Sequence, residues 1–93
     1  MLEELECPYC GENYLHQIKV DVFQRSEDEE SVFHVQVGNT RIAKTAVVNN
    51  NISGNPSLRR NGLTITFSCE TCEETPKLDL AQHKGRTLVT WRK

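Results

Sequence analysis

Two short cysteine motifs, far apart in the sequence, decide the fold of this chain. Residues 7–11 read Cys7-Pro8-Tyr9-Cys10-Gly11, and residues 69–72 read Cys69-Glu70-Thr71-Cys72. Two residues between cysteines allow one tight turn to aim both sulfurs at a point about 2.3 Å away, and two such turns supply the corners of a tetrahedron. Zinc suits these donors because its filled d shell imposes little geometry and it binds thiolates well. The sequence therefore predicts one structural zinc ion, held by Cys7, Cys10, Cys69 and Cys72.

Three other uses of these cysteines remain open on spacing alone. Disulfides need an oxidising compartment, but residues 1–6 are acidic where a signal peptide is basic, so we expect a cytoplasmic protein. Residues 7–10 match the glutaredoxin tetrapeptide, yet in that class the motif lies between a strand and a helix, and no strand precedes it here. Iron, alone or in an iron–sulfur cluster, takes the same four thiolates.

The two motifs differ at the residue that follows the second cysteine. Gly11 readily adopts the left-handed backbone conformation that suits this turn, whereas Glu73 stands at the matching position of the second motif. We therefore expect the second turn to be wider or more strained than the first.

Apolar residues alternate with polar ones over much of the remaining chain, which predicts strands. In the first strand this alternation places Val20 and Val22 on one face and Lys19 and Asp21 on the other. No long amphipathic helix supplies a crossover, so a parallel sheet is not expected. We predict one mainly β domain over residues 1–93, a small antiparallel meander of five or six strands with little or no helix, although 78–82 allows one helical turn. The predicted strands are 14–25, 32–37, 41–48, 63–68, 77–80 and 87–91, with turns at 38–39 and 82–85.

Composition and motifs exclude several classes of protein. The chain has 93 residues, of which 37% are apolar and 26% are charged, as in a soluble globular domain. Its longest apolar run, residues 46–48, is far shorter than the roughly 20 residues of a membrane span, so we expect no membrane contact. Four thiolates saturate zinc and leave no position for a catalytic water. We therefore predict that the protein is not an enzyme, and we infer no small-molecule substrate.

Charge is distributed unevenly along the chain. Residues 1–31 hold nine acids and two bases, whereas residues 32–62 hold four bases and no acid. The polar stretch 49–62 contains five asparagines and is long for a connection in a compact domain. We therefore interpret it as a functional binding surface or a mobile insertion. Arg59 and Arg60 within it either contact a partner or pair with the acidic run 27–30. The candidate binding residues are Arg41, Lys44, Arg59, Arg60, His83 and Lys84.

Residues 55–62, 67–72 and 82–85, together with Trp91 and the first cysteine motif, resemble a group of small zinc-ribbon proteins carried by bacteria and their prophages. The resemblance implies the zinc-ribbon fold and a metal, and it brings no activity with it. Two functions follow as hypotheses. The domain docks a protein partner through the loop or a sheet edge. Alternatively, it is a nucleic-acid-binding accessory or regulatory protein that uses the basic segment 41–62.

Overall fold

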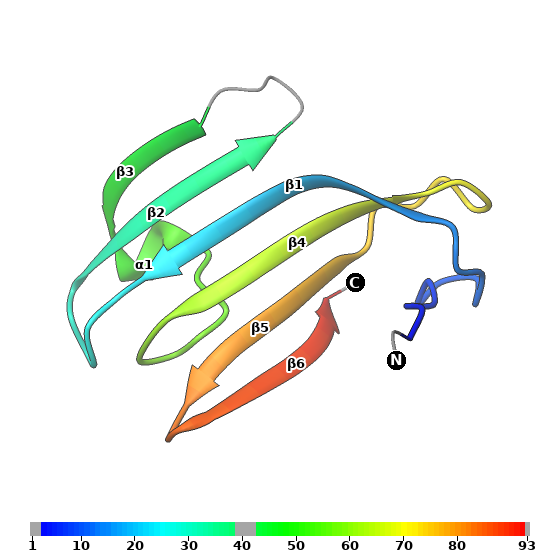
Figure 1. Ribbon diagram of the computed structural model, residues 1–93. Helices are drawn as coiled ribbons and strands as arrows, with labels where there is room; N and C mark the ends of the chain where they lie inside the picture. The colour runs from blue at the N-terminus through cyan, green and yellow to red at the C-terminus, as the bar shows by residue number, and fades with distance from the viewer. Residues whose placement is uncertain (1–2, 39–42, 93) are drawn as a thin grey trace.

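The computed structural model describes residues 3–38 and 43–92 of the chain. These residues form one antiparallel sheet and, in the part described, a single short helix, α1 (Asn50–Ser53) (Figure 1). The predicted mainly β fold is confirmed, whereas a helical turn over 78–82 is wrong because those residues belong to a strand. The six strands are β1 (Leu15–Gln24), β2 (Ser31–Gly38), β3 (Ala43–Asn49), β4 (Gly62–Cys69), β5 (Lys77–His83) and β6 (Arg86–Arg92).

The strand order is β3-β2-β1-β4-β5-β6, which differs from a simple meander. Two three-stranded meanders meet where β1 pairs with β4, and Leu15 at the start of β1 lies opposite Cys69 at the end of β4. The chain must therefore cross from the edge strand β3 to the central strand β4. Three strand spacings of about 4.8 Å separate these two strands, which explains why the connection after β3 is long.

The two faces of the sheet differ completely in charge. Cross-strand pairing places Gln36, Asp21, Thr64 and Asp79 in one row on the face that we call the polar face. Every charged strand residue that the structure describes lies on this face. The opposite face, which we call the uncharged face, carries no Asp, Glu, Lys, Arg or His among the described strand residues. Its central part consists of Val20, Val22, Phe33, Val35, Val37, Thr45, Val47, Leu63, Ile65, Leu78, Leu80, Val89 and Trp91.

The connection between β3 and β4 lies over the polar face. A Cβ atom added at Gly62 would lie 2.7 Å from Cδ of Pro56, so glycine is required for this close approach. The Ser57 hydroxyl donates to the Gln82 carbonyl at 2.8 Å and accepts from the Arg60 amide at 3.0 Å, and Ser57 is buried. The stretch 49–62, which we predicted to be a functional binding surface or a mobile insertion, thus follows a defined, hydrogen-bonded path.

This covering reverses the burial that strand alternation alone suggests. In β1, Asp21 on the polar face is 7% exposed, whereas Val22 on the uncharged face is 41% exposed. Phe23 stacks on His34 with ring centroids 4.5 Å apart, and Val32 is fully buried nearby on the same face. Much of the packed core therefore lies between the polar face and the connection. On the uncharged face Phe67 and Leu78 are buried, whereas Val22, Phe33 and Val47 are exposed.

Candidate metal centre

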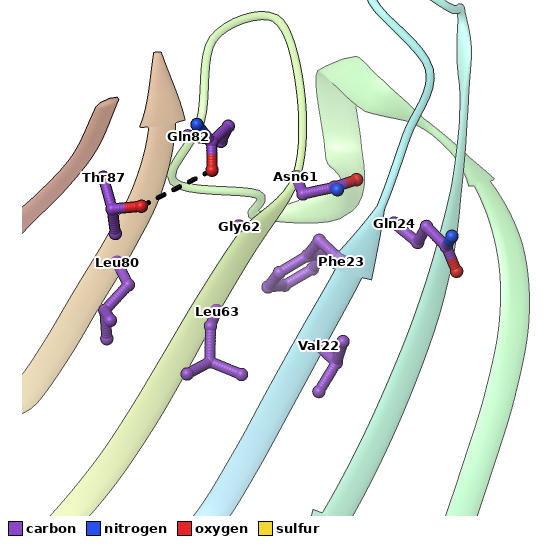
Figure 2. Close-up of a pocket in the computed structure, with 9 residues that line it drawn as sticks. All are labelled: Val22, Phe23, Gln24, Asn61, Gly62, Leu63, Leu80, Gln82 and Thr87. Carbon is purple, nitrogen blue, oxygen red and sulfur yellow. Dashed lines mark hydrogen bonds between the residues drawn. The ribbon is translucent and has the colours of Figure 1, made fainter. Parts of the chain in front are cut away.

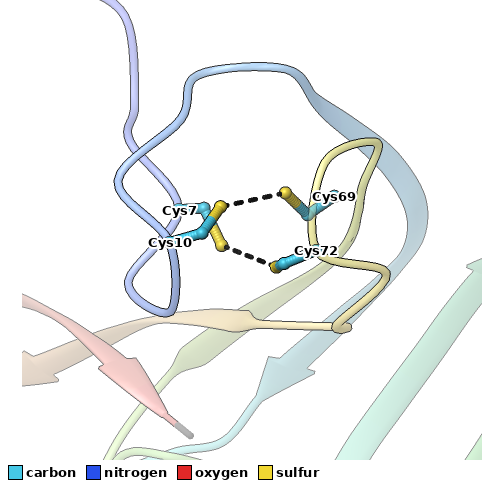
Figure 3. A group of neighbouring side chains, drawn as sticks. All are labelled: Cys7, Cys10, Cys69 and Cys72. Carbon is cyan, nitrogen blue, oxygen red and sulfur yellow. Dashed lines mark hydrogen bonds between the residues drawn. The ribbon is translucent and has the colours of Figure 1, made fainter.

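The cysteine turns meet at one end of the sheet because the first precedes β1 and the second follows β4, its neighbour (Figure 1). Sγ of Cys7 lies 3.7 Å from Sγ of Cys72, and Sγ of Cys10 lies 3.6 Å from Sγ of Cys69 (Figure 3). All four sulfurs lie within 4.8 Å of one another. Four sulfurs at about 2.3 Å from a tetrahedral zinc ion stand about 3.8 Å apart. The four cysteines are thus close enough to hold a metal ion.

Both turns are built with the same backbone hydrogen bonds. In the first, the Cys7 amide donates to the Glu12 carbonyl at 2.6 Å and the Gly11 amide donates to the Cys7 carbonyl at 2.9 Å. In the second, the Cys69 and Glu73 amides make the equivalent bonds, to the carbonyls of Glu74 and Cys69, at 3.1 Å each. The turns are therefore matched in geometry, although their sequences differ.

The second turn has the same geometry as the first although it lacks the glycine, so its backbone is strained at Glu73. Gly11 has a φ of 82° and Glu73 has a φ of 63°, so both adopt the left-handed conformation. This conformation costs a residue with a Cβ atom about 1–2 kcal/mol, and glycine avoids that cost. Of the two expected outcomes, a wider turn or a strained one, the structure has the strained turn.

Backbone amides and neighbouring thiols set the acidity of the cysteines. The amides of Cys72 and Thr71 lower the pKa of Cys69 to about 7, against the effect of burial. The Glu74 amide lowers the pKa of Cys72, but burial and the three other thiols raise it to about 12. Four thiolates so close together repel one another, and a divalent cation offsets this repulsion. The donor set therefore fits a metal such as zinc.

The cluster combines buried and exposed cysteines. Cys7 and Cys69 are 2% and 1% exposed, while Cys10 is exposed. The nearby His16 lies outside the cluster and pairs with Glu70, with Nε2 3.1 Å from Oε1. Among the described residues the four cysteines are the only group of His, Cys, Asp and Glu side chains close enough to hold a metal. Four sulfur ligands complete a tetrahedral shell.

The two arginines of the predicted binding surface pair with the acidic turn between β1 and β2. The Arg59 guanidinium contacts Asp28 through two nitrogens, at 3.0 and 2.7 Å, and Arg60 lies 2.8 Å from Glu27. The hydrogen bonds from Arg59 lower the pKa of Asp28, and Asp28 in turn raises the pKa of Arg59. The ion pairs with the acidic run are therefore present, and contact of these arginines with a partner stays a prediction.

The other predicted binding residues do not gather at one place. Arg41 lies outside the described residues. Lys44 is exposed on the edge strand β3, whereas His83 and Lys84 lie at the turn between β5 and β6, toward the opposite edge. The structure thus places these candidates at separate edges of the sheet.

Two buried carboxylates on the polar face were missed by the sequence analysis. Asp21 Oδ1 lies 2.7 Å from His34 Nε2 and accepts from the side-chain Nε2 of Gln36 at 2.9 Å. Asp79 Oδ1 accepts from the Thr64 hydroxyl at 2.7 Å and from Arg92 at 2.9 Å. The sequence shows each aspartate as a charged residue within a predicted strand. It does not show that the connection between β3 and β4 covers the polar face and buries these carboxylates.

No family model, curated protein or solved structure matches the chain. Within residues 3–38 and 43–92, no helix is long and apolar enough to cross a membrane.

Proposed function

We propose that this protein is a non-catalytic docking module, held together by one structural zinc ion, that binds a protein partner through its uncharged face. The metal assignment rests on the two matched turns and on sulfur separations close to those of a zinc tetrahedron. A saturated sulfur shell stabilises a fold and leaves no site for an activated water. A protein with such a metal site is better suited to docking, which requires only an exposed surface, than to catalysis at the metal.

The observation that carries the docking proposal is the exposure of apolar side chains on the uncharged face. Three cross-strand rows over six strands cover about 600 Å², given strands about 4.8 Å apart and rows about 6.7 Å apart. This reaches the upper end of the roughly 300–600 Å² that the largest apolar patch of a typical monomer covers, and such patches are often functional. No described helix or strand covers this face. Its most exposed large apolar side chains are Val22 (41%), Phe33 (45%), Val37 (48%), Val89 (62%) and Val47 (69%).

A hollow at the end of this face away from the cysteines offers a place for an anchoring side chain. Its volume is about 300 Å³, and Val22, Leu63 and Leu80 form its apolar floor (Figure 2). Uncharged polar groups form its rim, among them Gln82 and Thr87. A hollow of this composition favours an aliphatic or aromatic group over a charged one.

The nucleic-acid hypothesis has less support from the charges. Arg59 and Arg60 are neutralised by Glu27 and Asp28, so they offer a phosphate backbone little net charge. Binding to nucleic acid depends on unpaired cations that displace counterions. We therefore place the partner site on the uncharged face and not on the segment 41–62.

Photo-crosslinking in the native cells tests the docking proposal. A photoreactive residue at Val89 probes the uncharged face, and the same residue at the adjacent Leu88, which is 47% exposed on the polar face, is the matched control. We expect products of defined mass from position 89 and none from position 88. Equal products from both positions, or none from either, would overturn the proposal.

Elemental analysis of the purified protein tests the metal. We expect one zinc per chain, lost together with the native spectrum on chelation under reducing conditions. Iron in its place would overturn the zinc assignment, and protein that stays folded without any metal would overturn the structural role.

A further inference from the structure

We propose that the partner of the uncharged face is a second copy of this chain, so that two sheets pack face to face with Phe33 of each copy in the hollow of the other. This inference rests on the proposed function, that this face docks a protein. It goes further by naming the occupant and the contact that fixes the arrangement.

The charge distribution of the uncharged face favours contact with a second copy. A two-fold interface brings one surface against itself, so any charged residue near the axis meets its own like charge. The uncharged face carries no charged residue among the described strand residues, and the described strand charges all lie on the polar face. Such a face is compatible with itself, whereas a surface that selects a different protein commonly uses charge complementarity for specificity.

The area of the uncharged face is sufficient for a small dimer interface. A face of about 600 Å² on each copy gives about 1,200 Å² in total, which is the lower limit of specific protein interfaces. Twisted sheets pack face to face about 10 Å apart with their strands within about 30° of each other, and this arrangement suits two copies of one sheet. We expect a reversible dimer with a dissociation constant on the order of micromolar.

The position of Phe33 relative to the hollow fixes how the two copies would be arranged. The strand order β3-β2-β1-β4-β5-β6 has its midpoint between β1 and β4. A two-fold axis at this midpoint, parallel to the strands, places β2 of one copy over β5 of the other. Phe33 in β2 is paired with Gln24 in β1, and this cross-strand row continues through Asn61 to Gln82 and Thr87. The ring, 45% exposed in the single chain, therefore faces the hollow floored by Leu63 and Leu80.

Sedimentation of the metal-loaded full chain over a concentration series tests the proposal. We expect the mass to rise from 10.6 kDa to twice that value between about 1 and 500 µM. Phe33→Lys should weaken association at least about tenfold. The matched control Leu88→Asp replaces a residue of similar exposure on the polar face and should leave association unchanged. Metal content and circular dichroism establish that each variant is folded.

A charge swap tests whether Phe33 of one copy contacts the hollow of the other, or whether Phe33→Lys weakens association only by removing apolar surface. Thr87→Glu, on the rim of the hollow, should weaken association as Phe33→Lys does. Mixing the two variants should restore a dimer, because one contact then joins lysine with glutamate and the other keeps Phe33 and Thr87. Failure of the mixture to associate would overturn the assigned contact, even if the wild-type protein forms a dimer.

The outcomes also distinguish this inference from the docking proposal. A wild-type chain that stays monomeric throughout, with crosslinked products from position 89 of a mass other than twice the chain, would refute the second copy and retain docking. Loss of association in Leu88→Asp equal to that in Phe33→Lys would refute the assignment to this face. Absence of both association and crosslinked products would refute docking itself.

Discussion

Glu73 offers a direct test of the reasoning about the two cysteine turns. The turns share their hydrogen bonds and their left-handed residue, yet one has Gly11 and the other Glu73 at that position. Because the left-handed conformation strains a residue that has a Cβ atom, Glu73→Gly should stabilise the metal-loaded protein. The reverse change in the first turn, Gly11→Ala, should destabilise the protein, because alanine disfavours the left-handed conformation of residue 11. A Cβ atom at this position meets nothing within 4 Å, so no steric clash adds to the effect.

The magnitude follows from two opposing effects. Relief of the left-handed conformation contributes about 1–2 kcal/mol, whereas the greater freedom of glycine in the unfolded chain offsets about 0.5–1 kcal/mol. The net gain for Glu73→Gly is therefore about 0.5–1 kcal/mol, and the loss for Gly11→Ala is similar in size. For a domain of this length such a change moves the melting temperature by about 2–8 °C.

Thermal and urea unfolding in metal-saturated buffer provide the assay. Glu73→Gly also removes a negative charge near the thiolates, so Glu73→Gln, which removes the charge and keeps the Cβ atom, is the control. We expect the glutamine variant to gain less than the glycine variant. Equal gains in the two variants, or a Gly11→Ala protein as stable as the wild type, would refute the backbone explanation.

Three further predictions concern the metal, the connection and the paired arginines. Serine at any of the four cysteine positions should cost both metal and fold, because zinc binding worth roughly 10–16 kcal/mol matches or exceeds the whole stability of a small domain; a native NMR spectrum in a metal-free variant would contradict this. Gly62→Ala should destabilise the protein by about 1–3 kcal/mol in urea unfolding, because its Cβ atom would overlap Pro56 in the connection above it. Arg59→Glu with Arg60→Glu should lower the melting temperature only modestly, and the decrease should become smaller as the salt concentration rises. Crosslinking from position 89 should be unchanged in this double variant; loss of the crosslinked products would indicate that the arginines form the partner site.

The sequence by itself determined the features that depend on neighbours along the chain. The spacing within each cysteine pair fixes a turn, and four cysteines in two such turns suffice to predict one cluster. Alternation predicted all six strands within a few residues, because a strand exposes its residues with a period of two. The mismatch at Glu73 was also visible, since the left-handed conformation is a property of a single residue.

Only the tertiary structure decided which strands pair and which face is covered. The pairing of β1 with β4 joins residues 39 to 54 positions apart, and no local pattern encodes it. Alternation shows which residues share a face, but it does not show which face another segment will cover. Here the hydrogen bonds of Ser57 and the close approach at Gly62 hold the connection over the polar face, which buries Asp21 and leaves Val22 open. The surface on which the proposed function rests therefore depends on a long-range contact between a loop and a sheet.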